Sequence, residues 1–206
     1  MSQLVATAGQ AITADPFSFD NYTIKRKWFT FLGRDFQVLD PNGNLCMYVL
    51  HKLLTFKDEW NIFTDTSQRT ALVRVKARSA IGVNIVTDVF DAASGQVVGT
   101  VRSKGLKSIV RDTWEVLDAN GNVIGELTED SNGFLRRLLP TFFGMPIIPG
   151  RWHLAVNGQT AMQINEERQF FGKTFKVSTP GSAVDRRFAI GCALLALMKE
   201  IARESR

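Results

Sequence analysis

The chain of 206 residues has few of the residues that build metal centres and disulfide frameworks. It contains two cysteines, Cys46 and Cys192, and two histidines, His51 and His153. Two cysteines this far apart do not make a disulfide framework, and without close Cys or His pairs a tetrahedral zinc site is not expected. The histidines are isolated in the sequence, so each is expected on a strand face. The sequence therefore predicts no metal and no cofactor.

Catalytic motifs are also missing. The sequence has no Gly-x-Ser-x-Gly nucleophile elbow, no Gly-x-x-x-x-Gly-Lys phosphate loop and no dinucleotide-binding fingerprint. Cys192 lies within an apolar segment, where a thiol behaves as a small hydrophobic group. We therefore predict that the chain has no catalytic residues and is not an enzyme.

Long hydrophobic runs are absent as well. The first 17 residues have neither a basic leader nor a long apolar segment, so no secretory signal is predicted. The longest apolar run, Phe188 to Met198, has eleven residues, whereas a membrane-spanning helix needs about 20. These features predict a cytoplasmic protein without a transmembrane span.

The overall composition is that of a globular protein. Hydrophobic residues make up 45% and charged residues 22% of the chain, and the formal net charge is +5. A chain of this length commonly forms one all-β domain. We expect a flexible leader at residues 1–18 and a single domain at residues 19–206. The positive charge favours anionic partners such as phospholipid headgroups or nucleic acid.

A repeated phrase is the clearest internal feature. An aromatic residue opens an alternating strand, an aspartate closes it, and a turn leads to the next apolar strand. The closing aspartates Asp40, Asp65, Asp91 and Asp118 lie 25 to 27 residues apart, and residues 152–158 form a weaker fifth copy. Asn-Gly and Ser-Gly pairs supply the positive φ angles that tight hairpins need. The repeat predicts consecutive β-hairpins.

The C-terminal segment determines the predicted architecture. Asp185 precedes the apolar run, and Lys199 and Arg203 follow it, as the dipole of a helix favours. A helix that is apolar nearly all round is usually buried within protein. A barrel made of many hairpins is too wide for side chains alone to fill, but a helix can occupy it. We therefore predict a mainly β protein, a closed antiparallel barrel of about twelve strands around this helix.

Residues 131–150 interrupt the hairpin rhythm. This insertion is rich in Phe, Leu, Ile and Pro, and its prolines exclude a long helix or a central strand. Two interpretations stay open. The insertion closes one end of the barrel over the helix, or it enters a membrane interface or contacts a partner. In the second case the apolar contacts would be Phe142, Phe143, Ile147 and Ile148, beside Arg136 and Arg137.

Basic residues gather on two predicted strands. In residues 73–78, apolar side chains face one side and three cations face the other. A second basic group follows one repeat later, and the two would form one cationic surface if their strands were neighbours. The alternative is an ordinary solvated outer face. The candidate lipid- or anion-binding residues are Arg74, Lys76, Arg78, Arg102, Lys104, Lys107, Arg136 and Arg137.

One segment looks like a calcium loop. Asp118, Asn120 and Asn122 are followed by Glu129 at the twelfth position, but the sixth position is Val123 where such loops have Gly. The same Asp-x-Asn-Gly-Asn phrase begins at Asp40, where the twelfth residue is His51. Strand-forming residues flank both copies, so we interpret both as hairpin turns.

The order of these pieces resembles that of a known family. The relevant segments are residues 22–29, 36–43, 53–56 and 95–101, and Asp185-Arg186-Arg187 leading into the terminal helix. In this order they resemble the LURP-one-related and phospholipid scramblase-like proteins, which share the tubby-like fold. The resemblance spans residues 19–202. It implies a barrel of about twelve strands threaded by the C-terminal helix, and an association with membranes, phosphoinositides or phospholipids.

The resemblance and the charge together give a functional hypothesis. The chain is expected to be a non-catalytic domain that binds anionic phospholipid or phosphoinositide, peripherally, at the cytoplasmic face of the membrane. The cysteine-rich stretch of eukaryotic scramblases is missing, so lipid scrambling is not expected. The alternative is a protein-interaction or structural module without lipid binding. Nucleic acid is disfavoured because few aromatic residues are interleaved with the basic ones.

Overall fold

Twelve strands and one long helix make up the described part of the chain. The computed structural model describes residues 15–26, 34–51, 59–79, 85–103, 113–130, 149–167, 173–181 and 183–204. The elements are β1 (Asn21–Arg26), β2 (Arg34–Leu39), β3 (Leu45–His51), β4 (Glu59–Phe63), β5 (Ala71–Ser79), β6 (Val86–Asp91), β7 (Val97–Ser103), β8 (Thr113–Leu117), β9 (Val123–Glu129), β10 (Arg151–Val156), β11 (Gln159–Glu167), β12 (Lys173–Ser178) and α2 (Arg186–Glu204).

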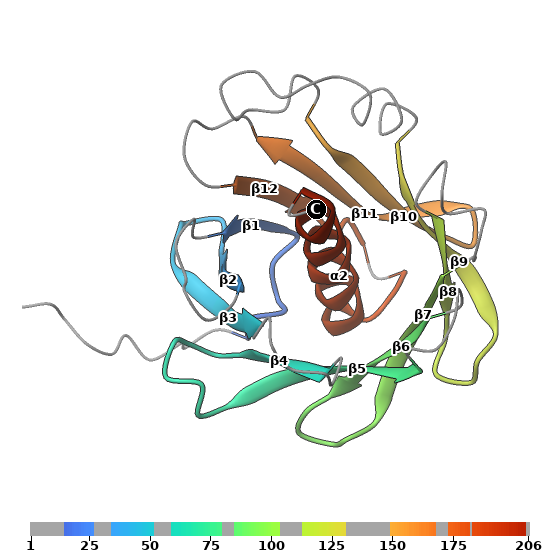
Figure 1. Ribbon diagram of the computed structural model, residues 1–206, viewed down its shortest axis with the longest axis horizontal. Helices are drawn as coiled ribbons and strands as arrows, with labels where there is room; N and C mark the ends of the chain where they lie inside the picture. The colour runs from blue at the N-terminus through green and yellow to red at the C-terminus, as the bar shows by residue number, and fades with distance from the viewer. Residues whose placement is uncertain are drawn as a thin grey trace, which may run out of the picture.

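The strands form a closed antiparallel barrel. Each strand pairs with its neighbours in sequence, and β1 pairs with β12 from Asn21↔Ser178 to Arg26↔Lys173, which closes the ring (Figure 1). Closure leaves none of the twelve described strands as a free edge strand, although β3 and β4 share a single registered pair, Tyr48↔Phe63. The predicted twelve-stranded barrel is confirmed.

The internal repeat has a structural counterpart in five hairpins: β2–β3, β4–β5, β6–β7, β8–β9 and β10–β11. Each hairpin carries a one-residue irregularity next to its turn, and the extra residue lies on the second strand. The extra residue is always apolar, and in the first four hairpins it recurs every 26 positions. An extra residue of this kind increases the local twist of a strand. The five extra residues are Cys46, Leu72, Val98, Ile124 and Ala161.

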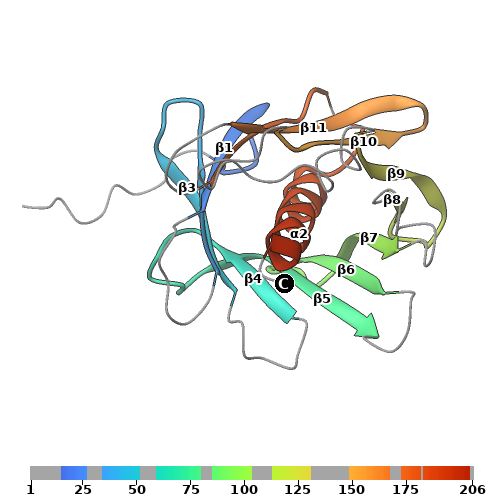
Figure 2. The ribbon, with the colours of Figure 1, turned by 45° about the horizontal axis from the view of Figure 1, so that its top comes forward.

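The barrel has two distinct ends. We call the end that carries the five hairpin turns the hairpin-turn end, and the end at which β1, β3, β5, β7, β9 and β11 finish the connection end. The chain returns from β12 at the hairpin-turn end, and α2 enters the barrel there. Figure 2 shows α2 running through the space that the strands enclose.

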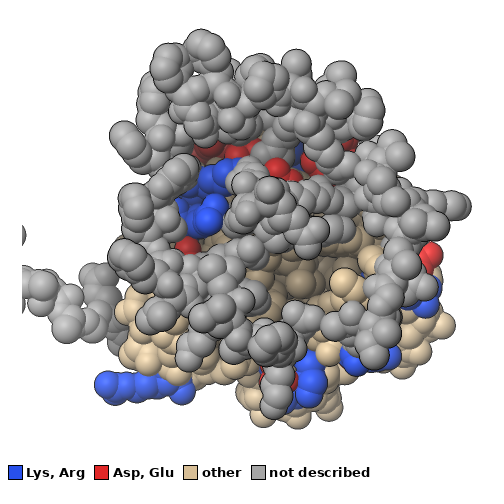
Figure 3. Space-filling view, viewed as in Figure 1, with Lys and Arg blue, Asp and Glu red and all other residues tan. Residues whose placement is uncertain are grey.

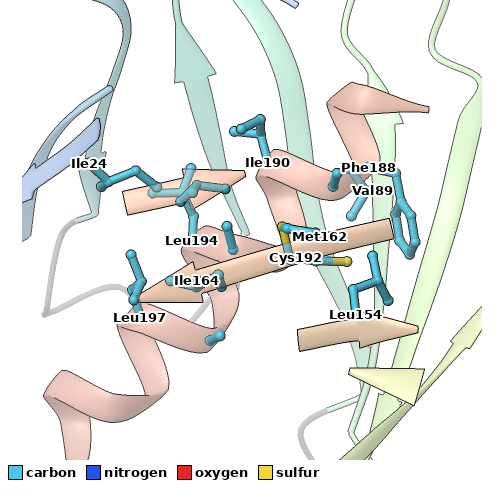
Figure 4. Packing of buried hydrophobic residues seen from close by; sticks show 14 of the residues in the cluster. Ile24, Val89, Leu154, Met162, Ile164, Phe188, Ile190, Cys192, Leu194 and Leu197 are labelled. Atoms are coloured by element: carbon cyan, nitrogen blue, oxygen red, sulfur yellow. The ribbon is translucent and has the colours of Figure 1, made fainter. Parts of the chain in front are cut away.

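The helix fills the interior of the barrel. Phe188, Ile190, Leu194 and Leu197 on α2 are buried almost completely, as are the inward-facing residues of the strands. Figure 4 shows these side chains beside Ile24, Val89, Leu154, Met162 and Ile164 from the surrounding strands. A helix of about 10–12 Å diameter with its side chains occupies such a space. The prediction that the apolar C-terminal segment is the core of the barrel is confirmed.

Small residues allow close contact between helix and wall. A Cβ placed on Gly191 of α2 would lie 3.1 Å from Cγ1 of Val89 on β6. The helix begins at a capped terminus, because the carboxylate of Asp185 accepts the N–H of Arg187 at 2.8 Å. Such a cap satisfies a backbone donor that the first turn of a helix leaves free.

Residues 15–20 lie at the hairpin-turn end, where they contact the start of α2. Arg186 donates to the carbonyl oxygens of Phe17 at 3.3 Å and Phe19 at 2.8 Å, and its guanidinium pairs with Asp20. Tyr22 also donates its hydroxyl to the carbonyl of Pro16 at 3.0 Å. Within the expected leader at residues 1–18, Phe17 packs against the core and its carbonyl accepts the bond from Arg186. Residues 1–14 lie outside the described part.

Candidate functional site

The predicted cationic residues of β5 lie on the outside of the barrel. Val73 and Val75 are completely buried toward α2, while Arg74, Lys76 and Arg78 alternate with them and face outward. The side chains of Lys76 and Arg78 are 54% and 61% exposed. The alternation that the sequence predicted is present. This strand therefore carries three cations on one face, which we call the β5 cation row.

Two members of the β5 cation row have carboxylate partners on neighbouring strands. Lys76 Nζ lies 3.4 Å from Glu59 Oε2 on β4. The Arg78 guanidinium forms a two-pronged pair with Asp88 on β6, in which Nη2 donates to Oδ1 at 2.8 Å. Asp88 is buried and also accepts the hydroxyl of Thr100 at 2.7 Å. Arg78 is therefore a structural partner of a buried carboxylate as well as an exposed cation.

Arg74 differs from its two neighbours in the row. Its guanidinium carbon lies 4.5 Å from the centre of the Phe90 ring, and among the described residues it forms no ion pair. A cation over an aromatic face gains electrostatic attraction from the ring without losing its charge. Arg74 is thus the member of the β5 cation row whose charge is not balanced by a nearby carboxylate in the described part of the chain.

The other basic candidates are not adjacent to this row. Arg102 lies on β7, which β6 separates from β5, and it pairs with Glu115 at 2.6 Å. The two basic strands would have formed one joint cationic surface only if they were neighbours. They are not, because β6 lies between them. Figure 3 likewise shows acidic atoms beside basic ones on the face that it presents. The remaining candidates lie outside the described residues: Lys104, Lys107, Arg136, Arg137, Phe142, Phe143, Ile147 and Ile148.

A buried ion pair lies inside the wall near the connection end, which the sequence analysis did not identify. Lys173 Nζ lies 3.1 Å from Glu166 Oε1, with side chains only 10% and 2% exposed. The second carboxylate oxygen of Glu166 accepts the N–H of Gly150 at 2.8 Å, and the Gly150 carbonyl accepts the N–H of Glu166 at 2.9 Å. Glu166 stands two residues after Ile164, so strand alternation places both side chains on the inner face. This spacing is the signal in the sequence from which a buried carboxylate could have been predicted. The pair anchors Gly150, which precedes β10, to β11.

His153 has a polar partner on the outside of β10. Its Nδ1 lies 2.9 Å from Asp130 Oδ1, and the N–H of Asp130 donates to the carbonyl of Arg151 at 2.9 Å. Both side chains are more than a third exposed. The expected position of His153 on a strand face is therefore found. The arrangement joins the ends of β9 and β10.

The segment that resembled a calcium loop is a hairpin turn. Asp118 Oδ1 accepts the N–H groups of Asn120 at 2.9 Å and Asn122 at 2.8 Å, and Oδ2 accepts the Asn122 side chain at 3.1 Å. These bonds, led by the one from the Asn122 side chain, lower the pKa of Asp118 below its usual value. Asp40 makes the same three contacts in the first hairpin. The turn interpretation is confirmed for both copies.

The described residues offer little for metal binding or nucleophilic chemistry. They contain no group of three or more His, Cys, Asp and Glu side chains placed to hold a metal ion. Burial raises the pKa of the Cys192 thiol strongly and that of Cys46 to about 12. A reactive cysteine is a thiolate in an electropositive, partly exposed site. Both thiols are instead protonated, buried parts of the core.

No helix of the described part combines the length and the apolar character needed to cross a membrane.

Comparison with known proteins supports the fold and no further property. No family model matches the chain, and no curated protein matches it significantly. Among solved structures, the X-ray structure of the Arabidopsis thaliana protein AT5G01750 is similar, with a TM-score of 0.52 and 15% sequence identity. The similarity covers 91% of this chain and 96% of the plant protein. The two proteins share a fold over nearly their whole lengths.

Proposed function

We propose that the chain is a non-catalytic domain of the LURP-one-related and scramblase-like kind that binds anionic phospholipid or phosphoinositide headgroups at the cytoplasmic face of a membrane. The observation that carries the proposal is the β5 cation row, in which Lys76 and Arg78 are exposed on the outer face and Arg74 is half-buried against the Phe90 ring. Because α2 fills the barrel, contact with a membrane belongs to the outer surface.

The strength of such binding can be estimated from the row. Each cation near an anionic membrane surface contributes about 1 kcal/mol, and the attraction falls off within a Debye length. Lys76 and Arg78 form ion pairs with Glu59 and Asp88, which offset part of their positive charge. Arg74 should therefore contribute most to the attraction toward anionic lipid. The binding is therefore weak, salt-sensitive and dependent on anionic lipid.

Vesicle flotation tests this proposal. The full chain is mixed with vesicles of neutral lipid alone, or of neutral lipid with phosphatidylserine or a phosphoinositide, at low and at physiological salt. The test variant is Arg74→Gln with Lys76→Gln. Arg78 is left in place because its removal would leave the buried Asp88 carboxylate without its cation. The matched control is Arg69→Gln with Lys176→Gln, which removes the same charge from a turn and from β12.

The wild-type chain and the control variant should float with anionic vesicles, and the test variant should bind about tenfold more weakly. Absence of salt-sensitive binding to either anionic composition at physiological salt would remove the proposal. Equal loss in both double variants would assign the attraction to net charge and would exclude the β5 cation row as its source.

The second candidate function is a protein-interaction module, and the cross-strand ion pairs favour it. Paired charges such as Lys76–Glu59 and Arg102–Glu115 cover a solvated surface without making it strongly basic. In this case a partner captured by the chain should depend on Phe142 and Phe143. The Arg74→Glu variant should still bind this partner, and the chain should not bind anionic vesicles.

A further inference from the structure

The pairing register of the barrel wall sets Arg74 apart from the rest of the β5 cation row. Arg74 lies opposite Asn61 on β4 and opposite Phe90 on β6, and neither of these neighbours is charged. Side chains that lie directly opposite each other on one face of a sheet interact. The register therefore gives Arg74 an amide on one side and an aromatic ring on the other.

Lys76, two residues further along β5, has acidic surroundings instead. It lies opposite Glu59 on β4 and opposite Asp88 on β6, so a carboxylate stands on each side of it. A lipid phosphate that approaches Lys76 must compete with the Glu59 carboxylate, 3.4 Å away. An anion that approaches Arg74 meets no carboxylate partner among the described residues.

The guanidinium of Arg74 lies against the ring of Phe90. Its central carbon is 4.5 Å from the centre of the ring, and cation–π attraction is significant within about 6 Å. Both side chains are half-buried, and the Nε of Arg74 is buried without a hydrogen-bond partner in the described part of the chain. Among the described residues, the Phe90 ring is thus the group that holds this guanidinium in place.

Phe90 is itself held by the wall of the barrel. It lies on β6, which pairs with β5 on one side and with β7 on the other, where Phe90 is opposite the half-buried Val97. The preceding residue, Val89, is completely buried toward α2. Because a packed core resists displacement, the backbone that carries the ring is fixed. Phe90 is therefore a fixed platform on the outer face.

We infer that Phe90 is a positioning residue of the proposed lipid-binding site, where it holds the guanidinium of Arg74 ready for the phosphate of an anionic headgroup. This inference rests on the proposed function and adds to it a residue that has no charge of its own. A cation on an aromatic face keeps its charge, and a side chain that is already held loses less freedom on binding. Arginine suits the position because its planar fork both stacks on a ring and matches a phosphate, unlike the compact ammonium of lysine.

Vesicle flotation of three single variants tests the inference. Phe90→Leu removes the aromatic face and keeps an apolar side chain, whereas Phe90→Tyr keeps the aromatic face. The matched control is Phe63→Leu, because Phe63 at the end of β4 is also half-buried and no described cation lies over its ring. Each full-length variant is mixed with vesicles of neutral lipid and phosphatidylserine, and circular dichroism checks that it is folded.

Phe90→Leu should bind about threefold more weakly than wild type, while Phe90→Tyr and Phe63→Leu should stay within about twofold of wild type. Phe90→Leu leaves the net charge of the chain unchanged, so its weaker binding would not come from diffuse electrostatic attraction. Wild-type binding by a folded Phe90→Leu variant would overturn the inference and leave the proposed function standing. If the wild-type chain itself does not float, the proposed function fails and the inference fails with it.

A double variant separates positioning from a general structural role. Once Arg74→Gln has removed the charge, adding Phe90→Leu should weaken binding no further, because the ring then has no cation to hold. Arg74→Lys keeps the charge without the planar fork, and it should weaken binding about threefold, as Phe90→Leu does. Fully additive losses in the double variant would show that the ring supports binding by another route, and would overturn the inference.

A measurement without lipid tests the contact itself. The ring current of Phe90 should shift the NMR resonances of the Arg74 side-chain protons, which the Arg74→Lys variant identifies. The shift should disappear in Phe90→Leu and persist in Phe90→Tyr. Its absence from the wild-type spectrum would overturn the inference whatever the flotation result. A normal shift in a wild-type chain that does not float would place the failure in the proposed function.

Discussion

Phe188 of α2 rests against Gly99 of β7 so closely that a Cβ on Gly99 would lie 2.6 Å from Cδ2 of the ring. Gly99 is an inward-facing position of the wall, paired with Val89 on β6. The absence of a side chain at this position lets the first turn of α2 pack between the strands. At this point the fit of the helix against the wall depends on a glycine that faces an aromatic ring.

Gly99→Ala should lower the free energy of unfolding by about 1–3 kcal/mol, because an added methyl forces a well-packed core to shift. Urea unfolding followed by tryptophan fluorescence measures the change. The double variant Gly99→Ala with Phe188→Leu should lose less than the sum of the two single variants, since the smaller side chain gives the methyl room. Strict additivity would show that the contact does not limit packing.

The fold was predictable to a large extent because its signals are local and repeated. Asp40, Asp65, Asp91 and Asp118 marked the turns, and the apolar run from Phe188 indicated a buried helix. The 26-residue recurrence of Cys46, Leu72, Val98 and Ile124 was not predicted. A bulge shifts the pairing register between two strands, and this register cannot be predicted from the sequence of either strand alone.

The candidate site was less predictable because charge partners lie across strands. The alternation in β5 correctly placed Arg74, Lys76 and Arg78 outward. That Lys76 meets Glu59 and Arg78 meets Asp88 depends on the pairing of β4, β5 and β6, which single-strand patterns do not give. The Glu166–Lys173 pair was missed for the same reason.

The hairpin aspartates predict a specific dependence of stability on pH. The pKa of Asp118 is lowered in the folded chain, chiefly by the Asn122 side chain, so its charge stabilises the fold above the ordinary aspartate pKa of about 3.9. That contribution is lost as the pH falls through the lowered folded pKa. Asp118→Asn keeps an acceptor oxygen but removes the charge. It should be less stable than wild type at pH 7 and equal to it near pH 2.

Thermal unfolding of wild type and Asp118→Asn between pH 2 and pH 7 measures this difference. Glu126→Gln, at an exposed position of β9, serves as the control for loss of a carboxylate. A stability gap that persists unchanged at pH 2 would show that the amide fails as a turn acceptor and that charge is not the cause.

Adding Ca²⁺ should leave the unfolding temperature of wild type unchanged, since the Asp118 oxygens already accept three hydrogen bonds.

The buried Glu166–Lys173 pair should show strong coupling. Removing one partner of a buried ion pair typically costs 3–5 kcal/mol, whereas replacing both is often far milder. Lys173→Met and Glu166→Gln should each destabilise the chain by about 3 kcal/mol, and the double variant should be more stable than their sum implies. A double-mutant cycle in urea measures the coupling. The exposed pair Lys176–Glu167 is the matched comparison and should show about 0–1 kcal/mol.

The position of α2 inside the barrel is tested by two adjacent leucines. Leu194 is completely buried between helix and wall, whereas Leu195 is only partly buried. Leu194→Ala should lower the free energy of unfolding by about 2–5 kcal/mol through lost burial and the cavity left behind, and Leu195→Ala by about 1 kcal/mol. If α2 instead lay on the outside of the barrel, the two substitutions would cost similar small amounts. Deletion of residues 188–206 provides the stronger test: the remaining strands would enclose an unfilled apolar interior and should fail to fold, and a stable truncated barrel would contradict the central position of the helix.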